Sequence, residues 1–381
     1  MTIIDYDLHG FVGIRLLDAS PREVAAITRD LGPIQKTLTR EPDILIRFVD
    51  HLSLSTPVRY LGLDDAGFTD HAFLVLRSKQ KSRARVQIPF DKIGRQCEII
   101  CERGLSAVPL LIPILNLTAL GKGILPLHAS AFDYQGTGVV VTGWAKGGKT
   151  ETLLAFARNG ADYIGDEWIY LSSDGRYMYG IPEPIRLWDW QLQDLPEYSA
   201  QITRADRGRL RMLRMLVSTL KRIESNGQGP LANSAPLVRR VIHQLQWQQN
   251  VRVAPQKLFR QGFGSLVGHP KKVFFVTSHE ASEVRVEPVD PEEVARRMVF
   301  SLQAERIDLL SYYLKFRFAF PDASNALIDQ LEEYQRELLS CILKDKDTYS
   351  VYHPYPVHIP SLFDAISPFC NQWESAKARG L

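Results

Sequence analysis

The chain is 381 residues long, and 45% of its residues are hydrophobic while 23% are charged. This composition is typical of globular domains and excludes an extended disordered chain or a collagen-like repeat. Because the length exceeds what one ordinary core supports, we predict two units: a small α+β unit over residues 1–120 and a larger unit over residues 121–381.

The formal net charge of +3 conceals an uneven distribution of charge along the chain. Residues 201–278 contain fourteen Lys or Arg but two acidic residues, so this stretch is strongly basic and the remainder is acidic. We interpret residues 201–260 as a basic helical insertion and expect an acidic partner there. We do not expect nucleic acid as the partner, because few aromatic residues lie among these basic ones and no nucleic-acid-binding module is recognisable.

The N-terminal 18 residues lack the basic start and continuous apolar run of a signal peptide, so we expect a cytoplasmic protein. The longest uncharged apolar stretch, residues 105–120, contains Pro109 and Pro113 and falls short of the roughly 20 residues that span a bilayer. We therefore expect a buried helix or helix pair in this stretch and no membrane span.

Helices and strands are predicted along the whole first unit. Ser20 and Pro21 form a helix start, which predicts a helix over residues 22–31. Short runs of apolar and β-branched residues predict strands over residues 44–49, 72–76 and 84–88.

In the second unit, strand, glycine-rich loop, helix and strand follow one another between residues 121 and 190. Asp290 and Pro291 begin a predicted helix that ends near residue 303. Further predicted elements are helices over residues 206–223, 236–249 and 323–343, a buried strand over 272–277 and an extended tail over 349–360 that covers the surface.

The most informative motif is a glycine-rich loop placed between a predicted strand, residues 138–142, and a predicted helix, residues 151–159. Glycines allow successive backbone N–H groups to surround phosphate oxygens, and the start of a helix adds its positive dipole. A lysine then neutralises the terminal phosphates, and a hydroxyl binds the Mg²⁺ that bridges them. The loop residues are Gly143, Trp144, Ala145, Lys146, Gly147, Gly148, Lys149 and Thr150. We predict that this loop binds a nucleotide such as ATP, with Mg²⁺.

An acidic pair, Asp166 and Glu167, interrupts an apolar strand pattern 16 residues after the loop. Carboxylates at a strand end beside a nucleotide loop can hold Mg²⁺ or accept the proton of an attacking hydroxyl. A solvated turn is the alternative interpretation, because the sequence Gly-Asp-Glu is also ordinary in turns.

Residues 127–171 resemble the core of the HPr kinase/phosphorylase-like group, whose nucleotide-binding fold is similar to that of phosphoenolpyruvate carboxykinase. The resemblance covers the segment that begins Leu-His-Ala-Ser-Ala, the glycine-rich loop and the acidic pair. It implies an α/β fold: a mixed-sheet P-loop kinase domain preceded by a small α+β domain. It also implies a kinase that uses ATP and Mg²⁺.

The resemblance assigns roles to individual residues. It implies that His128 is a site histidine and that Glu151 is the acid that follows the loop. Asp166 corresponds to the base that accepts the proton of the acceptor hydroxyl and lies near the metal. Glu167 stands where the group usually has Asp, and its longer side chain can still reach Mg²⁺. We therefore predict Thr150, Asp166 and Glu167 as the metal ligands.

Two departures from the group concern the acceptor. Trp144, Ala145 and Lys146 replace small residues in the loop, and the basic stretch shows no counterpart of the group's protein-capturing loop. Arg186, in a segment flanked by prolines, is a further catalytic candidate, because its planar guanidinium suits a phosphoryl group or an anionic substrate.

Two functions from different classes remain open. The first is a kinase that transfers the γ-phosphate of ATP to a hydroxyl on a protein Ser or on a small, anionic molecule. Lys149 and Mg²⁺ then neutralise the phosphates and Asp166 activates the hydroxyl. The second is a non-catalytic regulatory protein that binds nucleotide and docks an acidic partner on the basic stretch. A homo-oligomer is compatible with both functions.

Overall fold

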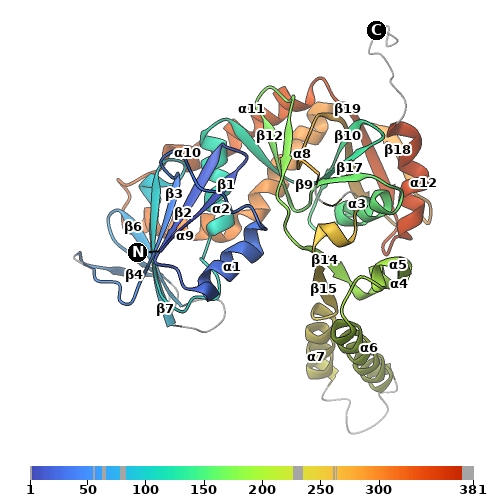
Figure 1. The fold of residues 1–381 in the computed structure, drawn as a ribbon, viewed down its shortest axis with the longest axis horizontal. Helices are drawn as coiled ribbons and strands as arrows, with labels where there is room; N and C mark the ends of the chain where they lie inside the picture. Colours follow the sequence, from blue (N-terminus) through green and yellow to red (C-terminus); the bar gives the residue numbers. More distant parts are fainter. Residues whose placement is uncertain are drawn as a thin grey trace.

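The computed structural model describes residues 2–54, 56–61, 66–77, 83–225, 235–260, 262 and 264–370. These residues form a mixed α/β fold built around two large sheets, which confirms the predicted class (Figure 1). Among them, no helix has both the length and the hydrophobicity that a bilayer crossing requires.

The first sheet contains, within the described ranges, eight strands in the order β1-β2-β3-β8-β7-β6-β5-β4. The three central neighbours β2, β3 and β8 are parallel, and the other pairs are antiparallel. The strands are β1 (Ile3–Leu8), β2 (Val12–Leu17), β3 (Ile44–Val49), β4 (Arg59–Leu61), β5 (Ala66–Phe68), β6 (Ala72–Arg77), β7 (Arg83–Pro89) and β8 (Cys97–Glu102). The predicted strands are confirmed as β3, β6 and β7.

Two helices of this part of the chain agree with the sequence. Helix α1 (Pro21–Leu31) begins with a reciprocal cap, in which the Ser20 hydroxyl accepts from the Glu23 amide and the Glu23 carboxylate accepts from the Ser20 amide. This cap satisfies two backbone donors at the helix start. The apolar stretch forms one buried helix, α2 (Leu111–Gly121).

The second sheet contains, in the part of the chain that the structure describes, nine strands in the order β16-β13-β12-β9-β10-β17-β19-β18, with β11 paired to β9. Strands β10, β17 and β19 are parallel and form its centre. The strands are β9 (Ile124–Tyr134), β10 (Thr137–Gly143), β11 (Asp162–Gly165), β12 (Trp168–Ser172), β13 (Met178–Gly180), β16 (Val267–Gly268), β17 (Pro270–Ser278), β18 (Arg285–Pro288) and β19 (Asp347–His353).

Helices cover both faces of this sheet, so the middle of its central strands is buried and apolar, as in residues 139–141 of β10 and 273–276 of β17. Val139 and Val141 of β10 enter a core with α3 (Lys149–Arg158) and α12 (Ile359–Cys370). Val140 points to the opposite core, which contains residues of α2 and of two further helices, α8 (Pro291–Glu305) and α11 (Leu331–Leu343). This two-sided burial fixes the end of β10, where the glycine-rich loop begins.

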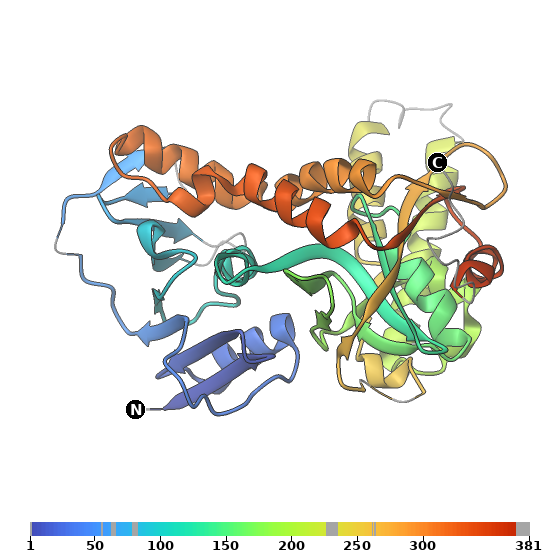
Figure 2. The ribbon, with the colours of Figure 1, turned by 90° about the horizontal axis from the view of Figure 1, so that it is seen from above.

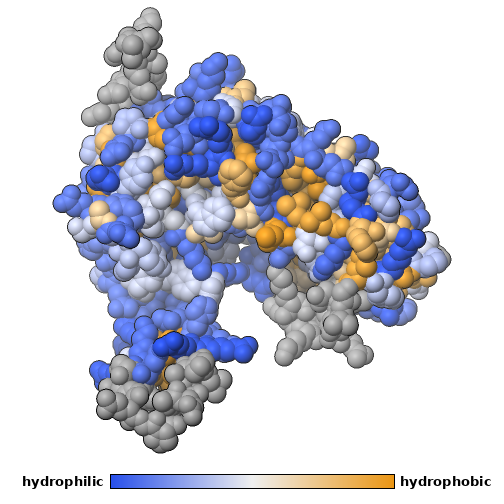
Figure 3. All heavy atoms as spheres, turned by 180° about the vertical axis from the view of Figure 1, so that it is seen from behind, coloured by the Kyte–Doolittle hydropathy of each residue, from blue (hydrophilic) through white to orange (hydrophobic). Residues whose placement is uncertain are grey.

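The chain returns to the first sheet after α8. Helix α9 (Ile307–Ala319) places Phe316 against Phe90, with ring centroids 5.0 Å apart, and Asn325 Nδ2 donates to the carbonyls of Phe90 and Ile93. Figure 2 shows α8 and α9 running in succession from one sheet to the other. The outer face of α9 is hydrophobic, and Figure 3 shows hydrophobic surface gathered over this half of the molecule.

Two predictions for the C-terminal part are wrong. The predicted helix over residues 323–343 is divided into α10 (Ala326–Asp329) and α11, because Asn325 begins α10 as its cap and the helix stops at Gln330. The predicted surface tail over residues 349–360 is instead strand β19 as far as His353, paired to β17 and β18, and Ile359 begins α12. The β-branched and aromatic residues of β19 pair well inside a sheet, and Pro354 ends the strand.

A two-stranded ribbon flanks the basic helices and consists of β14 (Ile185–Trp188) and β15 (Asn250–Val253). The insertion therefore begins before residue 201, because the register pair Trp188 and Asn250 lies 62 residues apart along the chain. Between them lie α4 (Asp189–Asp194), α5 (Pro196–Ser199), α6 (Arg204–Ser225) and α7 (Ala235–Trp247). Helices α6 and α7 pack side by side and project away from the second sheet, which confirms both predicted helices (Figure 1).

Candidate active site

The glycine-rich loop lies between β10 and α3. Strand β10 ends at Gly143, and α3 begins at Lys149. The Gly143 carbonyl accepts a hydrogen bond from Ser301 Oγ of α8 at 3.3 Å, which ties the first residue of the loop to a helix far along the chain. Because α3 follows the loop directly, the free backbone amides at its start point toward the loop, as binding of an anion requires.

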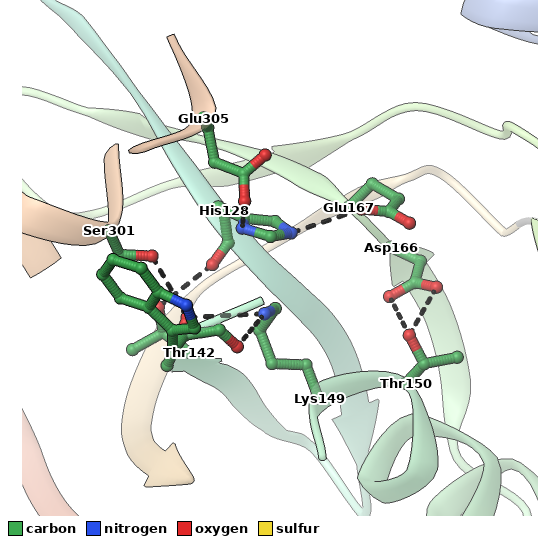
Figure 4. A network of polar contacts seen from close by, with 10 residues as sticks. His128, Thr142, Lys149, Thr150, Asp166, Glu167, Ser301 and Glu305 are labelled. Atoms are coloured by element: carbon green, nitrogen blue, oxygen red, sulfur yellow. Dashed lines mark hydrogen bonds and ion pairs between the residues drawn. The ribbon is translucent and has the colours of Figure 1, made fainter. Parts of the chain in front are cut away.

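Lys149 folds back over the loop (Figure 4). Its Nζ donates to the Trp144 carbonyl at 2.9 Å and to the Gly143 carbonyl at 3.4 Å, and the residue is only 6% exposed. Burial lowers the pKa of Lys149, while the negative charges of Glu167 and Asp166 act in the opposite direction. The ammonium is thus held beside the loop by two carbonyls that a phosphate can replace.

His353, at the end of β19, supports the other side of the loop. Its Nε2 lies 2.7 Å from the Gly147 carbonyl. Gly148 has a φ of +108°, and a Cβ at this position would lie 2.4 Å from His353 Nε2. Only glycine therefore fits at residue 148, for reasons of both backbone conformation and space. His353 was missed in the sequence, since its segment was predicted to be a surface tail.

The acidic pair occupies the link between β11 and β12. Thr150 Oγ1 donates to Asp166 Oδ2 at 3.1 Å and to Oδ1 at 3.3 Å (Figure 4). Burial, and then the charge of Glu167, raise the pKa of Asp166 to about 7. Glu167 has a φ of +62°, a left-handed conformation that is uncommon outside glycine. This turn directs the two carboxylates to different partners.

Glu167 faces His128 of β9 rather than Thr150. His128 lies between two carboxylates, with Nε2 3.2 Å from Glu167 Oε2 and Nδ1 2.9 Å from Glu305 Oε1 (Figure 4). Burial opposes protonation of His128, but the two carboxylates outweigh it and raise its pKa. In turn, the hydrogen bond from His128 lowers the pKa of both Glu167 and Glu305. The arrangement favours an imidazolium between two carboxylates.

Glu305 and Ser301 were not predicted from the sequence. Both belong to α8, more than 150 residues after the loop, and no local pattern distinguishes them from other helical surface residues. Their signal is spatial, because α8 packs across the end of β10 and β9 and directs both side chains toward the loop and His128.

The remaining predicted residues lie around this centre. Glu151 Oε1 accepts from Gln191 Nε2 of α4 at 2.8 Å, and therefore points toward α4. Trp144 is 56% exposed at the tip of the loop, next to Ala145. Lys146 Nζ lies 4.1 Å from the centre of the Trp247 ring, a cation–π contact between the loop and the end of α7.

Arg186 lies on β14, exposed to solvent. The pKa of Glu167 is lowered first by its hydrogen bond with His128, and the positive charges of Lys149 and Arg186 add to this effect. Arg186 thus acts on the site through its charge, without a direct hydrogen bond to Glu167 or Asp166 among the contacts of the described residues.

The site offers Mg²⁺ an incomplete set of ligands. In the ranges that the structure describes, His, Cys, Asp and Glu side chains form no group of three or more arranged to hold a metal ion. The Thr150 hydroxyl and the Asp166 carboxylate are nevertheless the hard oxygen ligands that Mg²⁺ takes together with phosphate oxygens and water. The pair fits a cation that a bound nucleotide also helps to hold.

Comparison with known proteins adds no family to this description. A scan against protein-family models finds no match, and a search of curated proteins finds no similar sequence. We therefore infer the function from the geometry of the loop, the acidic pair and His128.

Proposed function

We propose that this protein is a Mg²⁺-dependent kinase that transfers the γ-phosphate of ATP to a hydroxyl, on a domain of the phosphoenolpyruvate carboxykinase-like type. The observation that carries the proposal is the contact between Thr150 and Asp166 beside Lys149, at the junction of a buried strand and a helix. The resemblance of residues 127–171 to the HPr kinase/phosphorylase-like group supports it.

Nucleotide binding would use groups already in position. Backbone amides of the loop and of the start of α3 bind the phosphates, and Lys149 Nζ exchanges the Trp144 and Gly143 carbonyls for phosphate oxygens. When bound by Thr150 and Asp166, Mg²⁺ supplies positive charge to the β- and γ-phosphates. His128 holds Glu167 away from Thr150, so the phosphates meet fewer negative charges at this point.

Proton transfer would be the task of Asp166. Its carboxylate lies at the start of α3, 3.1 Å from the Thr150 hydroxyl and beside Lys149, where an acceptor hydroxyl that approaches the γ-phosphate would come within reach of it. Asp166 takes the proton of the acceptor hydroxyl while the oxygen of that hydroxyl forms the bond to the γ-phosphorus. The bond from that phosphorus to the β–γ bridging oxygen breaks, and ADP leaves.

The test measures binding and transfer separately on the full-length protein. Titration calorimetry with ATP and Mg²⁺ should show binding to the wild type and to Asp166→Asn, and none to Lys149→Ala. Incubation with γ-labelled ATP and a cell extract should yield a labelled product with the wild type and none with Asp166→Asn. Exposed Asp364→Asn is the matched control and should behave as the wild type. Transfer retained by Asp166→Asn would remove the assigned base.

One contact favours the second function, a nucleotide-dependent docking protein without transfer. Lys146 links the loop to Trp247, at the end of the basic helix α7. Phosphates bound in the loop compete with the Trp247 ring for the Lys146 ammonium, so nucleotide would change how α6 and α7 are held. In this case, an acidic partner binds only with nucleotide present, and the extract contains no labelled product.

A further inference from the structure

A pocket of about 850 Å³ lies between the two parts of the molecule, apart from the glycine-rich loop. Its walls come from α1 and from the two segments that flank the β14–β15 ribbon, and Figure 1 shows α1 facing this ribbon. Most of its lining is apolar, and the lining includes Val24, Ala25, Thr28, Pro182, Pro184 and Ala254. The volume is that of a small-molecule site.

Contacts between the two parts hold the walls of the pocket in place. His9 Nε2 lies 2.7 Å from the Gly180 carbonyl. Gly32 has a φ of +70°, and a Cβ there would lie 2.7 Å from the Pro182 carbonyl, so the end of α1 rests directly on the opposite wall. The pocket walls are therefore held together by one side-chain contact and one close backbone approach.

Two arginines continue the pocket along the ribbon. Arg186 of β14 is paired in register with Arg252 of β15, and both are exposed. Side chains two residues apart on a strand point to the same face, so the face that carries the arginines continues toward Pro184 and Ala254 in the pocket wall. The alternate residues of both strands are buried on the other face of the ribbon.

The arginine pair interacts with Glu167 and Glu183 through its charge, but without direct contact. Among the described residues, neither Arg186 nor Arg252 forms an ion pair. Like charges directly opposite each other on paired strands destabilise the pairing, so the arrangement is unfavourable until an anion lies between them.

The segment that contains Pro182 and Pro184 also interacts with the acidic pair. Glu183, between the two pocket prolines, has a buried Oε1 without a hydrogen-bond partner in the described part of the chain. Burial, followed by the charges of Glu167 and Asp166, raises the pKa of Glu183, and Arg252 acts against this shift. The segment that carries the two pocket prolines also packs on β11, where the Tyr163 hydroxyl donates to the Ile181 carbonyl at 3.1 Å, and β11 leads directly to Asp166.

We propose that the pocket and the Arg186–Arg252 pair together form the acceptor site, and that the acceptor is a small anion with an apolar body. The apolar body occupies the pocket and the two guanidinium groups bind the anionic group. The hydroxyl is then directed toward Asp166. The role of the ligand as a phosphoryl acceptor rests on the proposed kinase function. The existence of the binding site is argued from the pocket and the arginine pair alone.

The probe is hexanesulfonate, which combines an apolar chain with a permanent anion, and methanesulfonate and hexanol are its matched controls. Calorimetry on the full-length protein should show hexanesulfonate binding up to roughly a thousandfold more tightly than methanesulfonate, since five more CH₂ groups are buried. Hexanol should also bind more weakly than hexanesulfonate. Equal affinities for hexanesulfonate and either control would overturn the proposal.

Three variants locate the bound probe. Arg252→Ala should weaken hexanesulfonate binding roughly tenfold or more, because a charge-assisted contact is lost. Ala25→Trp, a substitution on the exposed pocket side of α1, should remove the advantage of the longer chain. Exposed Lys257→Ala removes one positive charge beside the pocket and should leave the affinity unchanged. An affinity for hexanesulfonate that is unchanged in Arg252→Ala, or that falls equally in Lys257→Ala, would contradict the proposed binding site.

Nucleotide titrations separate this proposal from the kinase assignment. Lys149→Ala should lose ATP binding and keep hexanesulfonate binding, whereas Arg252→Ala should do the reverse. If the wild type binds hexanesulfonate as expected but not ATP with Mg²⁺, the kinase assignment fails and the pocket remains. If ATP binds and hexanesulfonate does not, the acceptor site fails alone. An acidic hexapeptide that binds as tightly as hexanesulfonate, with no effect of Ala25→Trp, would refute the small-molecule acceptor.

Discussion

Replacing Asp166 by Asn should stabilise the nucleotide-free protein, and more strongly as the pH rises. The pKa of Asp166 rises from its ordinary value near 4 to about 7 because the carboxyl is buried, 3% exposed, next to Glu167. The favourable protonated form is fully present below about pH 4, and its contribution is lost as the pH rises through about 7. The shift corresponds to roughly 4 kcal/mol at pH 8, and Asn avoids this cost because it has no charge.

Urea unfolding of the nucleotide-free protein at pH 5 and pH 8 measures the effect. We expect the free energy of unfolding of Asp166→Asn to exceed that of the wild type by roughly 2–4 kcal/mol at pH 8 and by much less at pH 5. Asp364→Asn, at an exposed position of α12, is the control and should show no such pH dependence. A difference that is the same at both pH values, or a less stable Asp166→Asn at pH 8, would refute the reasoning.

Glu305→Gln should lower the pKa of His128, as measured by NMR titration of its ring protons, because one of the two carboxylates that outweigh burial is neutralised. In the wild type, the contact between Glu305 and protonated His128 stabilises the protein below about pH 6.5, and this contribution is lost as the pH rises through the pKa of His128 in the folded protein. The variant should therefore be less stable than the wild type at pH 6 and equally stable at pH 9. Gly148→Ala should lose ATP binding and unfold more easily by more than about 1 kcal/mol, because its Cβ meets His353 at a positive φ. Calorimetry and urea unfolding check both effects, and His353→Ala should recover part of the stability; an unchanged affinity for ATP would show that the loop tolerates the methyl group.

Local sequence was sufficient for the elements that end at the site. The buried strand and the helix on either side of the loop occur as predicted, because both periodicities are read within about ten residues. The same holds for α1, where Ser20 and Glu23 form the cap within one turn, and for the basic helices α6 and α7. The proximity of Thr150 and Asp166 also follows from a short strand–loop–helix–strand order.

Long-range packing decided the rest. Residues 349–353 have aromatic and β-branched side chains that suit either an extended tail or a strand, and only the pairing with β17 placed them inside the sheet beside Gly147. Helix α9 was not predicted, since it has hydrophobic residues on several faces and its place is set by contact with the first sheet.

The site therefore consists of two groups of residues, those that are close together in the sequence and those that are far apart in it. Its glycine-rich loop and its acidic pair come from one segment of 25 residues, where hydrophobic periodicity and glycine spacing carry the information. Glu305, His353 and the pairing of Arg186 with Arg252 come from elements about 65 to more than 200 residues away from their partners. Such neighbours leave no local pattern in a sequence, because their proximity is produced by burial of the shared cores and by strand register, which only the folded chain has.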